Sequence, residues 1–356
     1  MEYGCEFQVL SNELNEKLFR KRVPLSGGIE LTSKCNFKCV HCYETMERDL
    51  NEVETLSVEK LYKIIDILEK MGCISVFLTG GEAMLDKRFD RIYTYLRKKG
   101  IMVAILSNGT SISKDKCELF KIYRPRMIDI SLYGASNETY KKVTRIEKGY
   151  EKLINGLELL KKYNIPFQLK AIILRDNINE LEKMRKVAEK YNVPIKLFTC
   201  IRPYNDGTRT PLNHMLSNEE IISLESKDKY ICEYYQNKKD SYIVKGLSER
   251  QKQCNTYLCR IAQNSFFITY DGVLNGCVRS RKHGYDLKKG SFEEGWKYLY
   301  ETFVKPREKV IFPCSECKLM NYCDFCPGEF EIETGSPTIA PINLCKLAHL
   351  RKKKFG

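Results

Sequence analysis

The chain has 356 residues, of which 43% are hydrophobic, and its formal net charge is +14. No stretch approaches the roughly 18 uninterrupted apolar residues of a membrane span, and residues 1–25 lack the apolar core of a signal peptide. We therefore expect a cytoplasmic globular protein with no membrane partner. Lysines stand beside glutamates in almost every predicted helix, which is typical of a solvated face and argues against nucleic acid as the main substrate.

Short apolar runs alternate with amphipathic stretches from residue 29 to residue 198. This alternation predicts a parallel α/β array with crossovers long enough for right-handed βαβ units. Both an open doubly wound sheet and a barrel fit it. The predicted strands are Ile29–Thr32, Ile74–Thr79, Met102–Ser107, Met127–Leu132, Phe167–Leu174 and Ile195–Phe198, and the predicted helices are Val58–Met71, Lys87–Lys99, Lys114–Tyr123, Gly149–Tyr163 and Ile178–Tyr191.

The composition changes twice beyond this array. A bridging segment contains Pro203, Gly207 and Pro211 and then a polar, helix-like stretch from Ser217. The last hundred residues are rich in cysteine and show little periodicity, so we expect them to bury little apolar area and to need metal to fold. We therefore expect an N-terminal extension over 1–28, the α/β array over 29–202, the bridge over 203–253 and a small cysteine-rich, metal-stabilised domain over 254–356.

Cys35, Cys39 and Cys42 follow the first predicted strand with the spacing C-x3-C-x2-C. The chain holds 16 cysteines, and in a reducing compartment they favour metal over disulfides. A structural zinc site is closed by four protein ligands, and a [4Fe–4S] cluster is usually held by four thiolates. Three thiolates without a fourth leave one iron open to a small molecule.

The run from Lys34 to Tyr43 resembles the cluster loop of the radical S-adenosylmethionine (radical SAM) superfamily. The resemblance implies that the open iron binds the amino and carboxylate groups of SAM, and that reductive cleavage gives a 5′-deoxyadenosyl radical. It also favours a partial (β/α)6 barrel over the open sheet. His41 and Tyr43 are expected to shield the cluster rather than to ligate it.

The ends of the following strands carry further motifs, at the edge where α/β barrels gather their chemistry. Each motif alone is an ordinary turn or a solvated side chain, but together they follow the cysteine triplet in strand order. Gly80-Gly81-Glu82 resembles the family motif that holds the methionyl amino group of SAM. The resemblance implies further SAM contacts at Ser131 for the ribose and Arg145 for the carboxylate. Ser107 and Asn108 at the end of the third predicted strand, and Lys170 and Leu174 on the fifth, are expected to line the same SAM pocket.

The cysteines after the bridge resemble those of the SPASM domain of radical SAM enzymes, although the domain's typical form has three residues, not two, between Cys323 and Cys326. Closed four-thiolate clusters transfer electrons and stabilise a domain with a thin core. A pair of zinc ribbons is the alternative. The resemblance implies one auxiliary [4Fe–4S] cluster on Cys254, Cys259, Cys277 and Cys326 and another on Cys314, Cys317, Cys323 and Cys345.

SPASM-bearing enzymes mostly act on peptides or proteins, so we expect an oxidoreductase that forms a thioether or carbon–carbon crosslink in a ribosomally made peptide. A flavodoxin or ferredoxin would supply single electrons. The sulfatase-maturing branch has an Asp where this chain has Val278, which argues against that branch. Because only 28 residues precede the first predicted strand, peptide recognition needs a separate protein, a cryptic surface or the bridge.

Three other functions stay open. Cys200 follows the sixth predicted strand and could donate a hydrogen atom to a substrate radical, as in a peptide epimerase, although simple packing also explains it. A radical SAM enzyme acting on a small molecule or an RNA base is the second. A metal-stabilised binding scaffold without enzymatic activity is the third.

Overall fold

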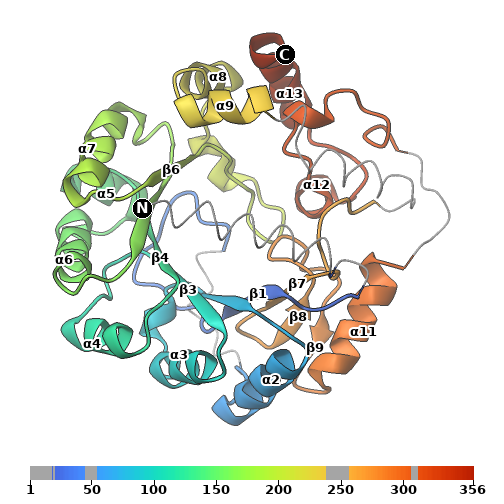
Figure 1. Cartoon of the computed structure of the whole chain (residues 1–356). Coiled ribbons are helices and arrows are strands. Elements are labelled where there is room, and N and C mark those ends of the chain that lie inside the picture. Colours follow the sequence, from blue (N-terminus) through green and yellow to red (C-terminus); the bar gives the residue numbers. More distant parts are fainter. Residues whose placement is uncertain (1–17, 19–20, 45–53, 238–255, 306–311) are drawn as a thin grey trace.

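A nine-stranded sheet organises the computed structural model, which describes residues 18, 21–44, 54–237, 256–305 and 312–356 (Figure 1). The strand order is β6-β5-β4-β3-β2-β1-β7-β8-β9, and the first seven strands pair in parallel. Because β1 to β6 neighbour one another in chain order without a reversal, the array is a partial barrel and not a doubly wound sheet. The strands are β1 (Ser26–Glu30), β2 (Ser75–Thr79), β3 (Met102–Ser107), β4 (Met127–Leu132), β5 (Phe167–Ile172), β6 (Ile195–Phe198), β7 (Ser265–Ile268), β8 (Val273–Asn275) and β9 (Tyr285–Asp286).

Helices cover the outer face of the curved sheet (Figure 1). Ser57, Ser113 and Ser136 each cap one of them by accepting a hydrogen bond from a backbone amide of the first turn. The helix α5 was not predicted, because it is short and rich in polar residues. The barrel helices are α2 (Val58–Lys70), α3 (Phe89–Lys98), α4 (Lys114–Ile122), α5 (Asn137–Thr144), α6 (Gly149–Lys162) and α7 (Leu181–Tyr191).

The bridge and the C-terminal part add further helices on the other side of the molecule (Figure 1). They are α8 (Asn218–Glu225), α9 (Lys229–Asn237), α11 (Phe292–Phe303), α12 (Pro327–Thr334) and α13 (Ile342–Phe355). Short 3-10 turns lie at Ala83–Leu85, Ile178–Glu180, Thr210–His214 and Met320–Tyr322. Within the described ranges, no helix has the length and apolar character needed to cross a bilayer.

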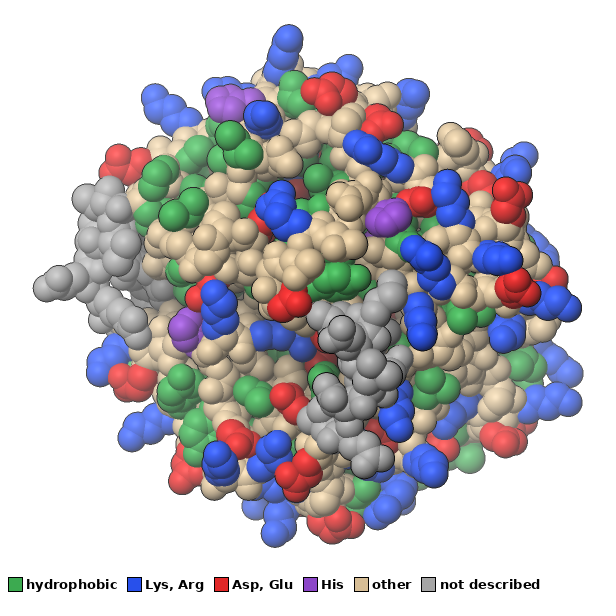
Figure 2. Space-filling model, turned by 180° about the vertical axis from the view of Figure 1, so that it is seen from behind, with side chains coloured by type: hydrophobic (Ala, Val, Ile, Leu, Met, Phe, Trp, Pro, Cys, Tyr) green, Lys and Arg blue, Asp and Glu red, His purple; other side chains and the backbone are tan. Residues whose placement is uncertain are grey.

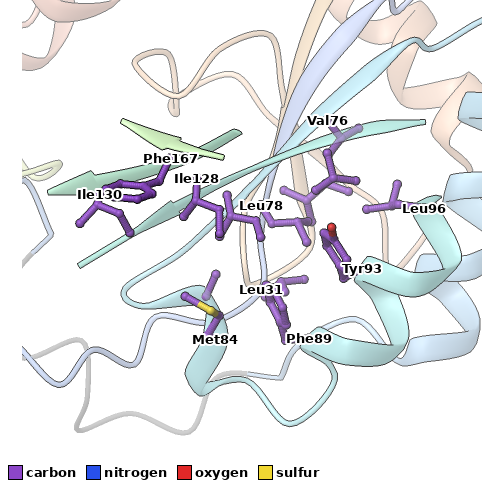
Figure 3. Close-up of a cluster of buried hydrophobic side chains, with 14 of the residues drawn as sticks. Leu31, Val76, Leu78, Met84, Phe89, Tyr93, Leu96, Ile128, Ile130 and Phe167 are labelled. Carbon is purple, nitrogen blue, oxygen red and sulfur yellow. The ribbon is translucent and has the colours of Figure 1, made fainter. Parts of the chain in front are cut away.

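The main core lies between the sheet and the outer helices. Figure 3 shows Val76 and Leu78 of β2 close to Phe89 and Tyr93 of α3, and all four side chains are buried. The rings of Phe89 and Tyr93 stack with centroids 5.7 Å apart, and Phe120 of α4 meets Tyr93 edge-on at 5.3 Å. Such aromatic packing contributes more than its buried area alone.

The inner face of β4 and β5 is polar. Side chains alternate along a strand, so Ile128 and Ile130 of β4 pack into the main core while Asp129 points into the barrel. Asp129 forms an ion pair with Lys170 of β5 and accepts a hydrogen bond from Gln168. The barrel interior therefore holds charged groups, as a binding site requires.

The first strand begins three residues earlier than predicted. Gly27 and Gly28 suggest a turn, but both lie within β1. A Cβ atom at Gly28 would overlap the rings of Phe77 and Phe267, which lie on the two flanking strands. Gly28 therefore makes room for aromatic rings inside the barrel, whereas Gly27 makes room for the ring of Phe266 in the main core.

The expectation of little apolar burial after residue 254 is wrong for residues 265–303. The strand β7 pairs with β1, and Phe266 and Ile268 are buried in the main core. Helix α11 adds Phe292, Trp296 and Leu299 to the same core. The apolar face of α11 is hard to recognise in the sequence because Glu, Gly and Lys residues stand between its apolar residues. The strand β7 is too short to show a clear alternation.

We predict that Phe292→Ala lowers the free energy of unfolding by about 3–5 kcal/mol, because it opens a cavity in the core shared by β7 and α11. Tyr298→Ala on the same helix is the control, since Tyr298 is 40% exposed, and it should change stability by no more than about 1 kcal/mol. Urea unfolding of protein prepared without iron measures both. Equal stability of Phe292→Ala and wild type would contradict the shared core.

Candidate active site

The cysteine loop, residues 31–44, leaves the C-terminal end of β1 and carries the predicted cysteine triplet. The backbone amides of Lys38 and Val40 donate to the carbonyl oxygens of Thr144 and Val143, each at 2.9 Å. Those carbonyls belong to the last turn of α5, where a helix has no internal partners for them. The unpredicted helix therefore positions the loop.

The three thiols of the loop gather around Tyr133, which follows β4. Cys35, Cys39 and Cys42 are all close enough to interact electrostatically with its phenol. Burial raises the pKa of Tyr133 well above its ordinary value, and the thiols add to this effect. His41 packs on Tyr133 with ring centroids 5.0 Å apart, and among the described residues its Nδ1 has no hydrogen-bond partner.

Gly80 and Gly81 bring the end of β2 against the cysteine loop. Gly80 has a φ of 149°, and a Cβ atom there would overlap the carbonyl oxygen of Thr32. A Cβ atom at Gly81 would overlap the carbonyl oxygen of Lys34. The amide of Gly81 donates to Thr32 and that of Glu82 to Lys34, both at 2.8 Å. The close approach that the glycines allow is therefore to the loop backbone.

The structure brings three predicted residues, Glu82, Ser107 and Asn108, into one hydrogen-bonded group. The carboxylate of Glu82 accepts from the hydroxyl of Ser107 at 3.0 Å and from the amide of Asn108 at 2.7 Å. The side-chain amide of Asn108 in turn lies 3.9 Å from the Sγ of Cys35. Glu82 is only 1% exposed, and burial raises its pKa to about 7.

Two further predicted SAM contacts lie inside the barrel. Ser131 hydrogen-bonds the side chain of Tyr133, which places it next to the thiols. Lys170 is ion-paired with Asp129 and is partly exposed to the barrel interior. The predicted polar residues of β4 and β5 thus share one surface with the cysteine loop.

Arg145 and Leu174 lie on the other side of the loop. Arg145 is exposed at the C-terminal cap of α5 in the left-handed conformation, with a φ of 63°. Leu174 is fully buried and packs with Val40 of the loop, Val143 of α5 and Ile201. Arg145 therefore presents a charge beside the loop, whereas Leu174 supports the loop through packing.

The C-terminal thiols fall into two groups. In the first group, Cys277 interacts electrostatically with Cys326, and Tyr257 interacts with both Cys259 and Cys326. Cys254 lies outside the described residues. The second group consists of Cys314, Cys317, Cys323 and Cys345, where Cys323 interacts with each of the other three. Within the described part of the chain, no three His, Cys, Asp or Glu side chains are placed so that they could hold a single metal ion.

Cys200 lines a cavity of about 300 Å³ between the end of β6, the bridge and α12–α13. Cys200 is exposed to solvent in this cavity, and partial desolvation by its surroundings, followed by the negative charge of Glu329, raises its pKa to about 12. Arg279 interacts with both Cys200 and Cys326. Cys200 therefore lies beside the first C-terminal thiol group, and its thiol keeps its proton at neutral pH.

Sequence reasoning missed a buried charge network inside the barrel mouth. Arg281 donates to Glu30 of β1 at 2.6 Å and forms an ion pair with Glu44 of the cysteine loop at 3.2 Å. Its guanidinium lies 5.8 Å from the ring centroid of Tyr43. Burial raises the pKa of Glu30 to about 7 although Arg281 opposes the shift. No local signal links residues that are 251 positions apart.

The comparisons with known proteins agree with this geometry. Residues 29–188 match the sequence model of the Radical SAM superfamily. Residues 29–188 therefore form a radical SAM domain. The cysteine loop, the glycine motif and strands β2 to β5 all lie within the matched residues.

The alignments with two curated relatives differ in the share of each protein that they cover. The chain is 31% identical over 163 residues to the antilisterial bacteriocin subtilosin biosynthesis protein AlbA of Bacillus subtilis, a match that covers 46% of this chain and 36% of AlbA. It is 27% identical over 322 residues to the AdoMet-dependent heme synthase of Methanosarcina barkeri, covering 86% of this chain and 92% of the relative. The chain therefore spans only about a third of AlbA but nearly all of the heme synthase.

A solved structure shows the same fold. It is native anSMEcpe with bound AdoMet and Cp18Cys peptide, with a TM-score of 0.65 and 17% identity, and the match covers 93% of this chain and 96% of that chain. The shared fold therefore extends beyond the radical SAM barrel into the C-terminal cysteine-rich region.

The residues of the cysteine loop fit an iron–sulfur cluster. Three thiols converge beside Tyr133, and the buried Nδ1 of His41 lacks a partner in the described structure. A cluster bound there would supply the electron that cleaves SAM. Lys170, Ser131 and the exposed Arg145 offer polar contacts around the loop, whereas the carboxylate of Glu82 already accepts from Ser107 and Asn108.

We predict that the stability of iron-free protein depends on the protonation of Glu82. Because burial raises its pKa from 4.5 to about 7, the folded protein keeps a proton that the unfolded chain loses, and this stabilisation is lost as the pH rises through 7. In urea unfolding, the stability of Glu82→Gln relative to wild type should rise by up to about 3 kcal/mol between about pH 4 and pH 8. A difference that stays constant with pH would show that Glu82 does not titrate in this way.

Proposed function

We propose that the chain is a radical SAM enzyme that modifies a peptide, forming a thioether or carbon–carbon crosslink, and that it holds three [4Fe–4S] clusters. The observation that carries the proposal is the division of the thiols into the loop triplet and two C-terminal groups. Ligands would be Cys35, Cys39 and Cys42 for the SAM-binding cluster, Cys254, Cys259, Cys277 and Cys326 for the first auxiliary cluster, and Cys314, Cys317, Cys323 and Cys345 for the second.

A crosslink removes two hydrogens from the peptide, so the reaction needs an electron acceptor. One hydrogen atom leaves with 5′-deoxyadenosine, and the second leaves as a proton and an electron. Glu30 and Asp129 are carboxylates on the inner face of the barrel, and each is held by a cation, Arg281 or Lys170. They give the barrel interior proton acceptors although position 278 is Val.

The residues around the loop would shield the reaction from water. Phe37, Tyr133 and Tyr140 form an aromatic group with ring centroids 6.2–6.5 Å apart. Phe37 and Tyr140 are buried under the loop. Such a dry, fixed environment limits side reactions of a radical.

The AlbA match supports a peptide substrate, because that relative takes part in bacteriocin biosynthesis. A separate peptide-recognition protein and a flavodoxin- or ferredoxin-type electron donor are part of the same proposal. The second candidate is a radical SAM enzyme acting on a small molecule. The heme synthase match favours it, since that alignment covers 92% of the relative.

We predict that anaerobically reconstituted protein binds about twelve irons, and that changing Cys35, Cys39 and Cys42 together to Ala removes about four of them and abolishes SAM cleavage. The control is Cys73→Ala with Cys117→Ala, because both thiols are buried in the main core. Iron analysis and 5′-deoxyadenosine formation under dithionite measure the outcome. Continued cleavage of SAM by the triple variant would refute the assignment of the loop, and zinc without iron would refute the clusters.

The mass of the product distinguishes crosslinking from epimerisation. We expect the peptide to become lighter by about 2 Da, because a crosslink removes two hydrogens. The thiol of Cys200 keeps its proton and could instead quench a Cα radical, which would leave the mass unchanged in ordinary water. A gain of one deuterium at a Cα in deuterated water, absent in Cys200→Ala, would overturn crosslinking. Turnover of a small molecule but no peptide would favour the second candidate.

A further inference from the structure

Helix α13 carries a thiol of the second C-terminal group to the surface of the molecule. Cys345 lies one turn into this helix and is exposed. It interacts electrostatically with Cys317, and Cys323 interacts with Cys345 in turn. Figure 1 shows α13 at the periphery, beside α8 and α9. The second thiol group therefore reaches solvent through one helix.

The helical period divides α13 into two faces. Positions three, four and seven apart share a face of a helix. Leu347, Ala348 and Arg351 are buried, with Arg351 ion-paired to Glu225 at 2.6 Å. The opposite face, which we call the α13 stripe, consists of Ile342, Cys345, Lys346, His349, Lys352 and Lys353, and all of these side chains are exposed.

The α13 stripe combines positive charge with an apolar end. Ile342 is 71% exposed. Among the described residues, no carboxylate forms an ion pair with Lys346, Lys352 or Lys353. On the face of the molecule shown in Figure 2, Lys and Arg side chains are interspersed with Asp and Glu. The stripe therefore differs from the mixed charges of that face.

We propose that the α13 stripe is the docking surface for an acidic one-electron carrier protein of the flavodoxin or ferredoxin class. A carrier seated there would lie directly over Cys345. Its negative surface would meet Lys346, Lys352 and Lys353, and Ile342 would give the contact an apolar centre. Complementary charge accelerates association and sets orientation more than it adds affinity. The inference rests on the proposed role of the second thiol group in holding a cluster.

The test uses reconstituted full-length enzyme and a purified acidic flavodoxin carrying FMN. Lys352→Glu with Lys353→Glu reverses two charges of the stripe without touching a proposed ligand. The matched control is Lys162→Glu with Lys186→Glu, which makes the same change of charge on exposed positions of α6 and α7. Because Glu near a helix C-terminus disfavours the helix, Lys352→Gln with Lys353→Gln is a milder second variant, and circular dichroism checks the folding of all three.

Surface plasmon resonance should show an association rate about tenfold lower for the stripe variant than for wild type, an intermediate loss for the Gln variant, and little change for the control. The loss should shrink at high salt. Zero-length carbodiimide crosslinking, analysed by mass spectrometry, should join flavodoxin carboxylates to Lys346, Lys352 or Lys353.

Poly(U) RNA, measured in the same way, tests whether the stripe binds nucleic acid instead. Three results would overturn the docking surface. They are an equal loss of flavodoxin association in the stripe variant and the control, crosslinks confined to other lysines, and a stripe variant that loses poly(U) binding but keeps flavodoxin binding. SAM cleavage driven by dithionite does not need docking, so it should be the same in all variants. A wild-type enzyme that binds flavodoxin through α13 but modifies no peptide would refute the proposed substrate and leave the docking surface standing.

Discussion

The close contact between the cysteine loop and the Gly80–Gly81 segment is the constraint on which the site depends. Both glycines let backbone meet backbone where any side chain would overlap a carbonyl oxygen. The two hydrogen bonds at 2.8 Å that result place Glu82 under the loop. From there Glu82 binds Ser107 and Asn108 at the end of β3, and Asn108 reaches Cys35. The ends of β1, β2 and β3 are thus held in one arrangement.

A second set of buried charges joins the two halves of the chain. Arg281 comes from the C-terminal part, yet it neutralises Glu30 on β1 and Glu44 on the cysteine loop. A buried carboxylate without a partner is costly, so removing Arg281 would leave an uncompensated charge in the barrel mouth. The C-terminal part is therefore not an appendage: it completes the sheet through β7 and the electrostatics of the loop through Arg281.

The alternation of strands and helices predicted the barrel well, because a helical period that repeats over a long segment is a reliable signal. The ranges of β3, β4 and β6 agree with the prediction at both ends. The errors have physical causes. The glycines of β1 resemble a turn because their packing against aromatic rings from β2 and β7 is a tertiary effect. Helix α5 has few apolar residues, and its part in holding the loop depends on backbone carbonyls, which no side-chain pattern reveals.

The sequence predicted correctly that several site residues lie close together, but it did not predict which hydrogen bonds and ion pairs they form. Glu82, Ser107 and Asn108 do come together, but they bind one another. Lys170 was predicted as a pocket residue, whereas its pairing with Asp129 required knowledge of strand register. The network of Glu30, Arg281 and Glu44 could not be predicted, because contacts between distant segments leave no trace in the spacing of a single sequence.

Exposure differs among the thiols, and among the described residues each C-terminal group has one exposed member, Cys259 in the first and Cys345 in the second. Cys39 is buried in the loop, Cys277 and Cys326 are half-buried where β8 and α12 meet the barrel, and Cys345 is exposed on α13. Burial protects a reactive centre from water, whereas exchange of electrons with another protein requires access. A chain that places its first thiols at the centre of a barrel and its last thiol on an exposed basic helix satisfies both requirements within one fold.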